Sequence, residues 1–267
     1  MNNTMTQTTS TPTTGALAPV ELSPVGLPFH RMALANPRHR WWRPLLTLAI
    51  TAVTWLLLSN VFSYALGVAT SGDDTIPFRE VGPVLLPHPN HPVGALLMFG
   101  QLALVIPALA LGVRLGEGRS LGTMTSVTGR LRWGRLGTHL LWALGVMGIA
   151  MGISLAVALT SGAPGPSVGP ATLGLLAVAI LVVPLQAAAE EYAFRALPQQ
   201  VLGSWLRSPW WGILLPIPLF TLGHLYNPTG LASVAVMALA MGILTWRTGG
   251  LEAAIALHIV NNVVAVD

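Results

Sequence analysis

Seven apolar segments, separated by polar connections, determine what this chain can fold into. A helix needs about 20 apolar residues to cross the hydrocarbon core of a bilayer, and the segments reach or approach that length. The last three are short and rich in glycine and proline, which is typical of helices packed inside a bundle. The pattern predicts an all-α fold, a polytopic transmembrane helical bundle with about seven spans (six to eight). The segments cover residues 44–68, 92–113, 138–160, 170–189, 209–224, 230–246 and 251–266.

The composition fits a membrane protein and excludes several other classes. Charged residues make up 8% of the 267 residues, against about 25% in soluble domains, so this chain could not cover a water-exposed surface. Its thirteen basic residues are all arginines. They lie between the apolar segments, which indicates orientation in a lipid bilayer and not binding to nucleic acid. The absence of cysteine excludes disulfides, thiolate metal sites and cysteine nucleophiles.

The distribution of arginine predicts which ends of the spans face the cytoplasm. Arginines cluster before the first segment, between the second and third, after the fourth and after the sixth. The loop after the first segment is instead acidic, with Asp73, Asp74 and Glu80 against one arginine. By the positive-inside rule, we expect a multi-pass protein of the cell membrane with a cytoplasmic N-terminus. The Thr- and Pro-rich residues 1–40 are expected to form a disordered cytoplasmic tail.

Two adjacent glutamates, Glu190 and Glu191, directly follow the fourth segment in the run LVVPLQAAAEEYAFRALPQQ. A charged side chain at bilayer depth costs about 2.5–3.5 kcal/mol on insertion scales, so two side by side indicate a functional site. In a helix, Glu191 and Arg195 lie on one face and can pair, whereas Glu190 points about 100° away. A salt-bridged cluster at the membrane interface is the structural alternative, but it leaves Glu190 without a partner.

Two later segments add histidines and amides. His224 stands in LFTLGHLYN, and His258 stands in AAIALHIVNNVV with Asn262 one helical turn later. A histidine and a carboxamide on one helical face can both donate to one oxygen. The structural alternatives are a packing histidine at the first position and an interhelical polar clasp, worth about 0.6 kcal/mol a bond, at the second. Spacing does not exclude Asn261. We expect Glu190, His224, His258 and Asn262 to line one polar cavity.

These residues resemble the three motifs of a known family. The patterns E-E-x-x-x-R, F-x-x-x-H and H-x-x-x-N are similar to those of the type II CAAX prenyl protease and bacteriocin-processing (ABI) family, also called CPBP intramembrane proteases. They occur here at residues 190–195, 220–224 and 258–262. Glu252 stands where that family usually has an apolar or aromatic residue. The resemblance divides the chain into a tail (1–40), N-terminal transmembrane spans (41–169) and a CPBP-like catalytic transmembrane domain (170–267).

The resemblance implies an intramembrane endopeptidase. Such a hydrolase cuts a peptide bond of a membrane-associated peptide or protein, such as a CAAX-type sequence or a leader peptide. Glu191 and Arg195 would support the catalytic helix. The implied catalytic roles are a general base for water (Glu190), its assistant (His224) and two donors to the oxyanion (His258 and Asn262).

Three alternatives stay open at this point. Glu190, His224 and His258 could instead bind a zinc ion as a His₂Glu set. The absence of a close H-x-x-x-H pair favours a mechanism without a cofactor. A non-catalytic membrane scaffold or bacteriocin self-immunity protein would be expected to have lost a motif residue, and none is lost. A proton-coupled transporter usually has internal repeats, which this chain lacks. The motifs fix neither the substrate nor the oligomeric state.

Overall fold

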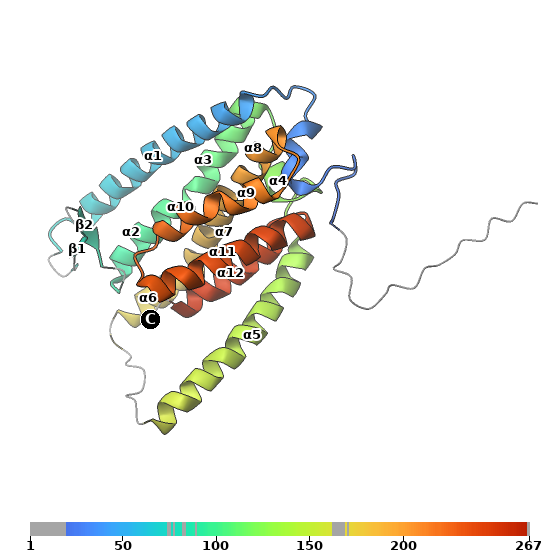
Figure 1. The fold of residues 1–267 in the computed structure, drawn as a ribbon. Coiled ribbons are helices and arrows are strands. Elements are labelled where there is room, and N and C mark those ends of the chain that lie inside the picture. The colour runs from blue at the N-terminus through green and yellow to red at the C-terminus, as the bar shows by residue number, and fades with distance from the viewer. Residues whose placement is uncertain are drawn as a thin grey trace, which may run out of the picture.

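A computed structural model describes residues 20–73, 76, 78–81, 84–88, 90–161, 169 and 171–265 of the chain. Apolar helices form a bundle, with a short two-stranded hairpin in one loop (Figure 1). The N-terminal half contains η1 (Phe29–Ala35), α1 (Arg43–Ala69), β1 (Phe78–Val81), β2 (Val84–Pro87), α2 (Pro92–Ala103), α3 (Val105–Gly112), η2 (Val113–Glu117), α4 (Gly122–Thr125) and α5 (Trp133–Thr160). The C-terminal half contains α6 (Thr172–Leu181), α7 (Val183–Glu191), η3 (Tyr192–Ala196), α8 (Leu197–Trp205), α9 (Trp210–Leu214), α10 (Pro216–Leu222), α11 (Pro228–Thr248) and α12 (Glu252–Ala265).

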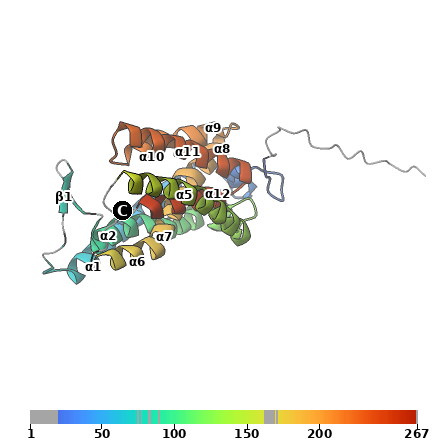
Figure 2. The ribbon, with the colours of Figure 1, turned by 90° about the horizontal axis from the view of Figure 1, so that it is seen from below.

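The predicted membrane bundle is confirmed. Within the described residues, five continuous helical stretches are long and apolar enough to span a bilayer, and Trp210–Leu222 is a shorter apolar helix. The helix α12 has 14 residues and rises roughly 21 Å, which is less than the thickness of the hydrocarbon core. Many large apolar side chains point outward, as lipid-facing residues should, and Leu141 and Ile149 of α5 are 72% and 67% exposed. The antiparallel hairpin β1–β2, which was not predicted, projects beyond the ends of the helices (Figure 2).

The glutamates lie inside one long helical stretch, Thr172–Trp205. The predicted span ended at residue 189, but α6, α7, η3 and α8 follow one another with only local changes of helical geometry. Pro184 and Pro198 stand in the first turns of α7 and α8, where a missing N–H costs little. Directly after the glutamates the chain forms a π-helical turn, a feature often found at functional sites. The site therefore sits within the bundle and not at a helix end.

The N-terminal segment departs from the expected tail. Residues 1–19 lie outside the described residues, but from residue 20 onward the chain packs onto the bundle. The 3₁₀ helix η1 lies against α8, and its Phe29 is fully buried. The expectation of a disordered tail to residue 40 is therefore wrong for residues 20–40. The prolines in this segment led to the prediction of disorder, but a few apolar residues among them are enough to anchor the segment to the bundle.

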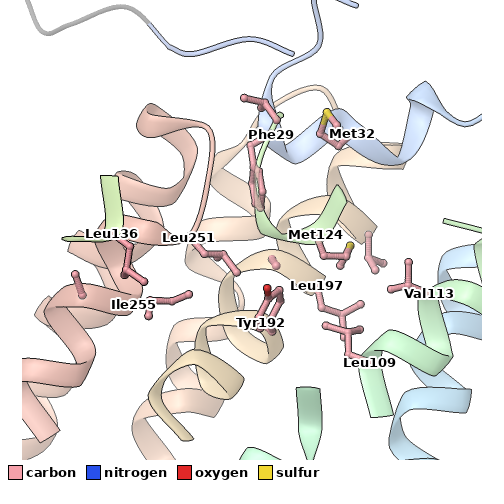
Figure 3. Close-up of a cluster of buried hydrophobic side chains, with 14 residues drawn as sticks. Phe29, Met32, Leu109, Val113, Met124, Leu136, Tyr192, Leu197, Leu251 and Ile255 are labelled. Atoms are coloured by element: carbon pink, nitrogen blue, oxygen red, sulfur yellow. The ribbon is translucent and has the colours of Figure 1, made fainter. Parts of the chain in front are cut away.

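The largest buried cluster lies at the end of the bundle where η1 and α4 pack, shown in Figure 3. Side chains from η1, α3, α4, η3, α8 and α12 meet there. Tyr192, two residues after Glu190, belongs to this cluster, and its hydroxyl lies 2.6 Å from Thr125 Oγ1. The core thus fixes the helix that carries the glutamates. Its labelled members are Phe29, Met32, Leu109, Val113, Met124, Leu136, Tyr192, Leu197, Leu251 and Ile255.

The connection between α4 and α5 also holds the start of α12. The turn between α11 and α12 reverses at Gly249, whose φ of 63° is a left-handed conformation that glycine adopts without strain. Backbone hydrogen bonds join this turn to the connection, from Val127 N to Gly249 O and from Leu251 N to Thr125 O. Because Thr125 also contacts Tyr192, one segment positions both α12 and the helix that bears the glutamates.

A buried ion pair reinforces this junction. The guanidinium of Arg132 donates two hydrogen bonds to Glu252, of 2.9 and 2.6 Å, and the Glu252 side chain is 1% exposed. Glu21 from the N-terminal segment accepts a further bond of 2.9 Å from Arg132 and pairs with Arg135. Burial opposes the charged guanidinium, but the carboxylates of Glu252 and Glu21 outweigh it and raise the pKa of Arg132. The unusual Glu252 thus has a structural partner.

We expect Glu252→Gln to destabilise the folded protein by roughly 1.5–3 kcal/mol, because Arg132 would lose charge-assisted hydrogen bonds. Thermal unfolding of the purified protein in detergent measures this loss. Glu21→Gln is the matched control: this carboxylate is 30% exposed, and such pairs contribute about 0–1 kcal/mol. Equal destabilisation by the two substitutions would contradict the importance assigned to the buried pair.

Candidate active site

The two glutamates end α7 and are both buried in the bundle. Glu190 is 9% exposed and Glu191 is fully buried. The predicted pair one turn apart is present, with 3.1 Å between Glu191 Oε1 and Arg195 Nη1. The Arg195 side chain is only 3% exposed, so both the guanidinium and the Glu191 carboxylate are shielded from solvent. Buried charges persist in proteins when they are paired, and this pair fixes the orientation of the turn that follows Glu190.

His258 of α12 lies between the two carboxylates. Its Nδ1 is 2.6 Å from Glu191 Oε1, and its Nε2 is 3.4 Å from Glu190 Oε2. Glu191 Oε1 therefore faces both Arg195 and His258. The sequence predicted the first of these contacts but not the second. Glu191 thereby links the first motif to the third across two helices.

The contact with Glu191 determines what His258 can do. An ionised carboxylate only accepts hydrogen bonds, so Nδ1 donates to Glu191. In the neutral ring Nε2 is then an acceptor, and only the doubly protonated ring can donate from Nε2 as well. A donor role for His258 toward a substrate oxygen accordingly requires the doubly protonated ring.

His224 lies just beyond the end of α10, not inside a helix as predicted. Its Nδ1 is 2.8 Å from the Phe220 carbonyl oxygen, which can only accept. Nδ1 therefore carries the proton, and Nε2 is the acceptor in the neutral ring. Within the described residues no hydrogen bond or ion pair joins His224 to either glutamate. Their connection runs through an aromatic ring.

That ring belongs to Phe220, the first residue of the second motif. Its centroid is 4.8 Å from the His224 ring and 6.1 Å from the His258 ring. The Arg195 guanidinium carbon lies 4.2 Å from the same centroid, within the range of a cation–π contact. Phe220 thus contacts one residue from each of the three motifs. This packing explains why an aromatic residue precedes the histidine by one turn.

Asn262 is held by a residue that the sequence reasoning missed. Asn262 Nδ2 donates to Gln186 Oε1 at 3.0 Å, and Asn261 Nδ2 donates to Asn262 Oδ1 at 3.1 Å. Gln186 is 2% exposed and stands one turn before Glu190 on α7. A polar residue four positions before a buried glutamate, on the same helical face, was the available signal.

The structure therefore brings the predicted residues together to different degrees. Glu190, Glu191, Arg195 and His258 are in direct contact, whereas Asn262 and His224 join through Gln186 and Phe220. The expected cavity shared by Glu190, His224, His258 and Asn262 stays a prediction. A small neighbouring pocket includes none of Glu190, His224, His258 and Asn262 in its lining. Its lining consists of Phe194, Arg195, Gly212, Ile213, Pro216, Ile217, Phe220, Ala238 and Gly242.

The alternative zinc ligands do not form a ligand set in this arrangement. In the described part of the chain no three His, Asp or Glu side chains are grouped so that they could hold a metal ion. Nδ1 of His258 is engaged by Glu191, and the Nε2 atom faces Glu190 at 3.4 Å, so a shared ion would have to displace these contacts or enter beside them. His224 also lacks a direct contact with Glu190. The residues present do not fit a preformed zinc site.

An acid, a histidine and amides buried within apolar helices define a polar site inside a multi-pass membrane protein. Residues 172–264 match the sequence model of the family described as type II CAAX prenyl endopeptidase Rce1-like. This match confirms the predicted resemblance for the C-terminal third of the chain, and it is consistent with a CPBP intramembrane protease.

The chain is also similar to the uncharacterized protein YyaK of Bacillus subtilis (strain 168). The two are 33% identical over 95 residues, which make up 33% of this chain and 32% of that relative. The chain thus matches about a third of the length of this curated relative. No solved structure matches the chain.

Proposed function

We propose that the protein is an intramembrane endopeptidase in which Glu190 activates a water molecule. The observation that carries this proposal is the environment of Glu190, buried on α7 beside His258. Its Oε2 atom accepts no hydrogen bond from the described residues. A buried acceptor of this kind needs a partner, and a water molecule is the partner that general-base hydrolysis requires.

The other residues take complementary roles. Glu190 removes a proton from water while the water oxygen attacks the peptide carbonyl, and the proton then passes to the leaving amine as the C–N bond breaks. His224, whose Nε2 is available as an acceptor, assists in holding the water. Doubly protonated His258 and the Asn262 amide donate to the oxyanion. Preorganised donors of this kind contribute about 2.7–4 kcal/mol each.

The substrate is a peptide or protein that reaches the bilayer, of the CAAX type or a leader peptide. The family match over residues 172–264 supports this class, as does the position of the site within apolar helices. Water activation requires no cofactor in this proposal. We therefore expect activity to persist in a zinc chelator such as 1,10-phenanthroline. Loss of activity that added zinc restores would replace the glutamate mechanism with a metal mechanism on the same residues.

A comparison of membrane peptides tests the proposal. Membranes from cells that express the wild-type protein and from cells that express Glu190→Gln are analysed by mass spectrometry for new peptide ends. The wild type should produce cleaved membrane peptides that the variant lacks. Identical peptide ends, at equal protein levels, would refute the protease and favour a non-catalytic scaffold.

We propose a cytoplasmic N-terminus for the chain. Arginines adjoin the start of α1, the connection from α3 to α5, the end of α8 and the end of α11. In Figure 1 these points lie at one end of the bundle, and the hairpin lies at the other. If the five long helical stretches of the described residues, the shorter Trp210–Leu222 and α12 all cross the bilayer, the C-terminus lies outside. A fluorescent protein that matures only in the cytoplasm should stay dark when fused after residue 267. Fluorescence there would mean that one short segment does not cross.

A further inference from the structure

Polar contacts cross the seam between α7 and α12 at two levels, one helical turn apart, and His258 meets Glu191 as well as Glu190 at the first level. Glu190 faces His258 at 3.4 Å, and Gln186 bonds Asn262 at 3.0 Å. Gln186 and Glu190 are four residues apart on α7, and His258 and Asn262 are four residues apart on α12. The two pairs therefore lie one helical turn apart on facing sides of the two helices. The first pair contains the proposed base and one proposed oxyanion donor. The second contains the other donor and a glutamine that has no role in the mechanism above.

With the amides of Gln186 and Asn261 oriented as they are, the bonds on both sides of Asn262 set the direction of its carboxamide. One Nδ2 proton is donated to Gln186, and Oδ1 accepts from Asn261. A reversed amide would put its carbonyl against the Gln186 carbonyl and its NH₂ against the Asn261 NH₂. Neither contact can form a hydrogen bond. The second Nδ2 proton has no partner among the described residues and is available to a ligand.

We propose that Gln186 is a positioning residue, which orients the Asn262 amide and holds α12 in register with α7 for oxyanion binding. The inference rests on the proposed function and deepens it. Gln186 is suited to this task because it is 2% exposed and stands on α7 one turn before the base. Its action passes through Asn262 and involves no contact with the substrate. Small misplacements of such groups can lower turnover by as much as roughly 100-fold.

The test is a double-mutant cycle on the membrane peptide whose cleavage depends on Glu190. Gln186→Met keeps the length of the side chain and removes the acceptor. We expect turnover to fall roughly 10- to 100-fold with little change in KM, and Asn262→Ala to lower turnover roughly 10²- to 10³-fold. Adding Gln186→Met to Asn262→Ala should cause no further loss, because residues that act as a unit are not additive.

The matched control is Gln199→Met on α8. Gln199 is also a fully buried glutamine, and its amide donates to Gly242 O at 3.0 Å, away from the site. It should lower thermal stability without lowering turnover per folded molecule. An equal loss from Gln186→Met in both backgrounds, or an equal loss from Gln199→Met, would overturn the inference.

The outcomes also separate this inference from the proposed function. If Asn262→Ala lowers turnover and Gln186→Met does not, only the role of Gln186 is wrong. If no peptide depends on Glu190, or Asn262→Ala leaves its cleavage unchanged, the proposed mechanism fails and the role of Gln186 fails with it.

Discussion

Glu190→Gln should lower turnover by roughly 10²- to 10⁴-fold, the contribution of a general base, while the protein still inserts and folds. The substitution keeps the shape of the side chain and removes its capacity to take a proton. Folding should tolerate it, because Glu190 makes no hydrogen bond from Oε2 and approaches His258 only at 3.4 Å. The measurement is kcat on the Glu190-dependent peptide, normalised to protein that elutes as a single species in detergent.

Glu117→Gln is the matched control for this experiment. Glu117 is the last residue of η2, which directly follows α3. Its side chain is buried (2% exposed) and pairs with Arg119 at 2.8 Å. The same chemical change there should lower stability and leave turnover per folded molecule unchanged. Wild-type turnover in Glu190→Gln would exclude the proposed base.

Arg195→Ala should lower both the folded yield and the activity. The substitution leaves Glu191, which is fully buried, without its guanidinium partner, and breaking a buried pair in this way costs about 3–5 kcal/mol. It also removes the guanidinium from the face of Phe220, at 4.2 Å, where a further contribution of about 0.5–2 kcal/mol is expected. Size-exclusion chromatography and thermal unfolding measure the stability, and cleavage of the peptide measures the activity.

Arg207→Ala provides the comparison for this second experiment. Arg207 follows α8 and is exposed, so its removal should change the unfolding temperature little. Arg195→Lys should recover part of the stability, because the charge remains while the planar fork is lost. A stable, fully active Arg195→Ala would show that Glu191 needs no counter-charge.

Helical spacing predicted contacts within one helix but not contacts between helices. The pair Glu191–Arg195 follows from an interval of four residues, and it is present at 3.1 Å. The contact between Glu191 and His258 depends on which face of α12 is turned toward α7. Residue spacing within either helix does not predict that orientation. The interval of four residues marks Gln186 as lying on the face of Glu190, but it does not show which side chain of α12 meets Gln186.

Segment length predicted that the chain forms apolar helices better than it predicted where those helices end. Apolar composition continues through the proline at 184, and the helix runs on past the glutamates to Trp205. His224 was placed within a helix because its neighbours are apolar, yet α10 ends at Leu222. The packing of the segment around Phe29 was not predicted, because local composition does not show that a helix far away in the sequence will contact this side chain.

The connection between α4 and α5 has a consequence for how this protein can be cut or recombined. The family match covers residues 172–264, but the ion pair that holds α12 comes from Arg132, and the hydroxyl partner of Tyr192 comes from Thr125. A fragment that begins at residue 172 would keep every motif residue and lose the contacts that position α12 and the helix bearing the glutamates. We therefore expect a folded chimera to need residues 120–135 together with the C-terminal helices.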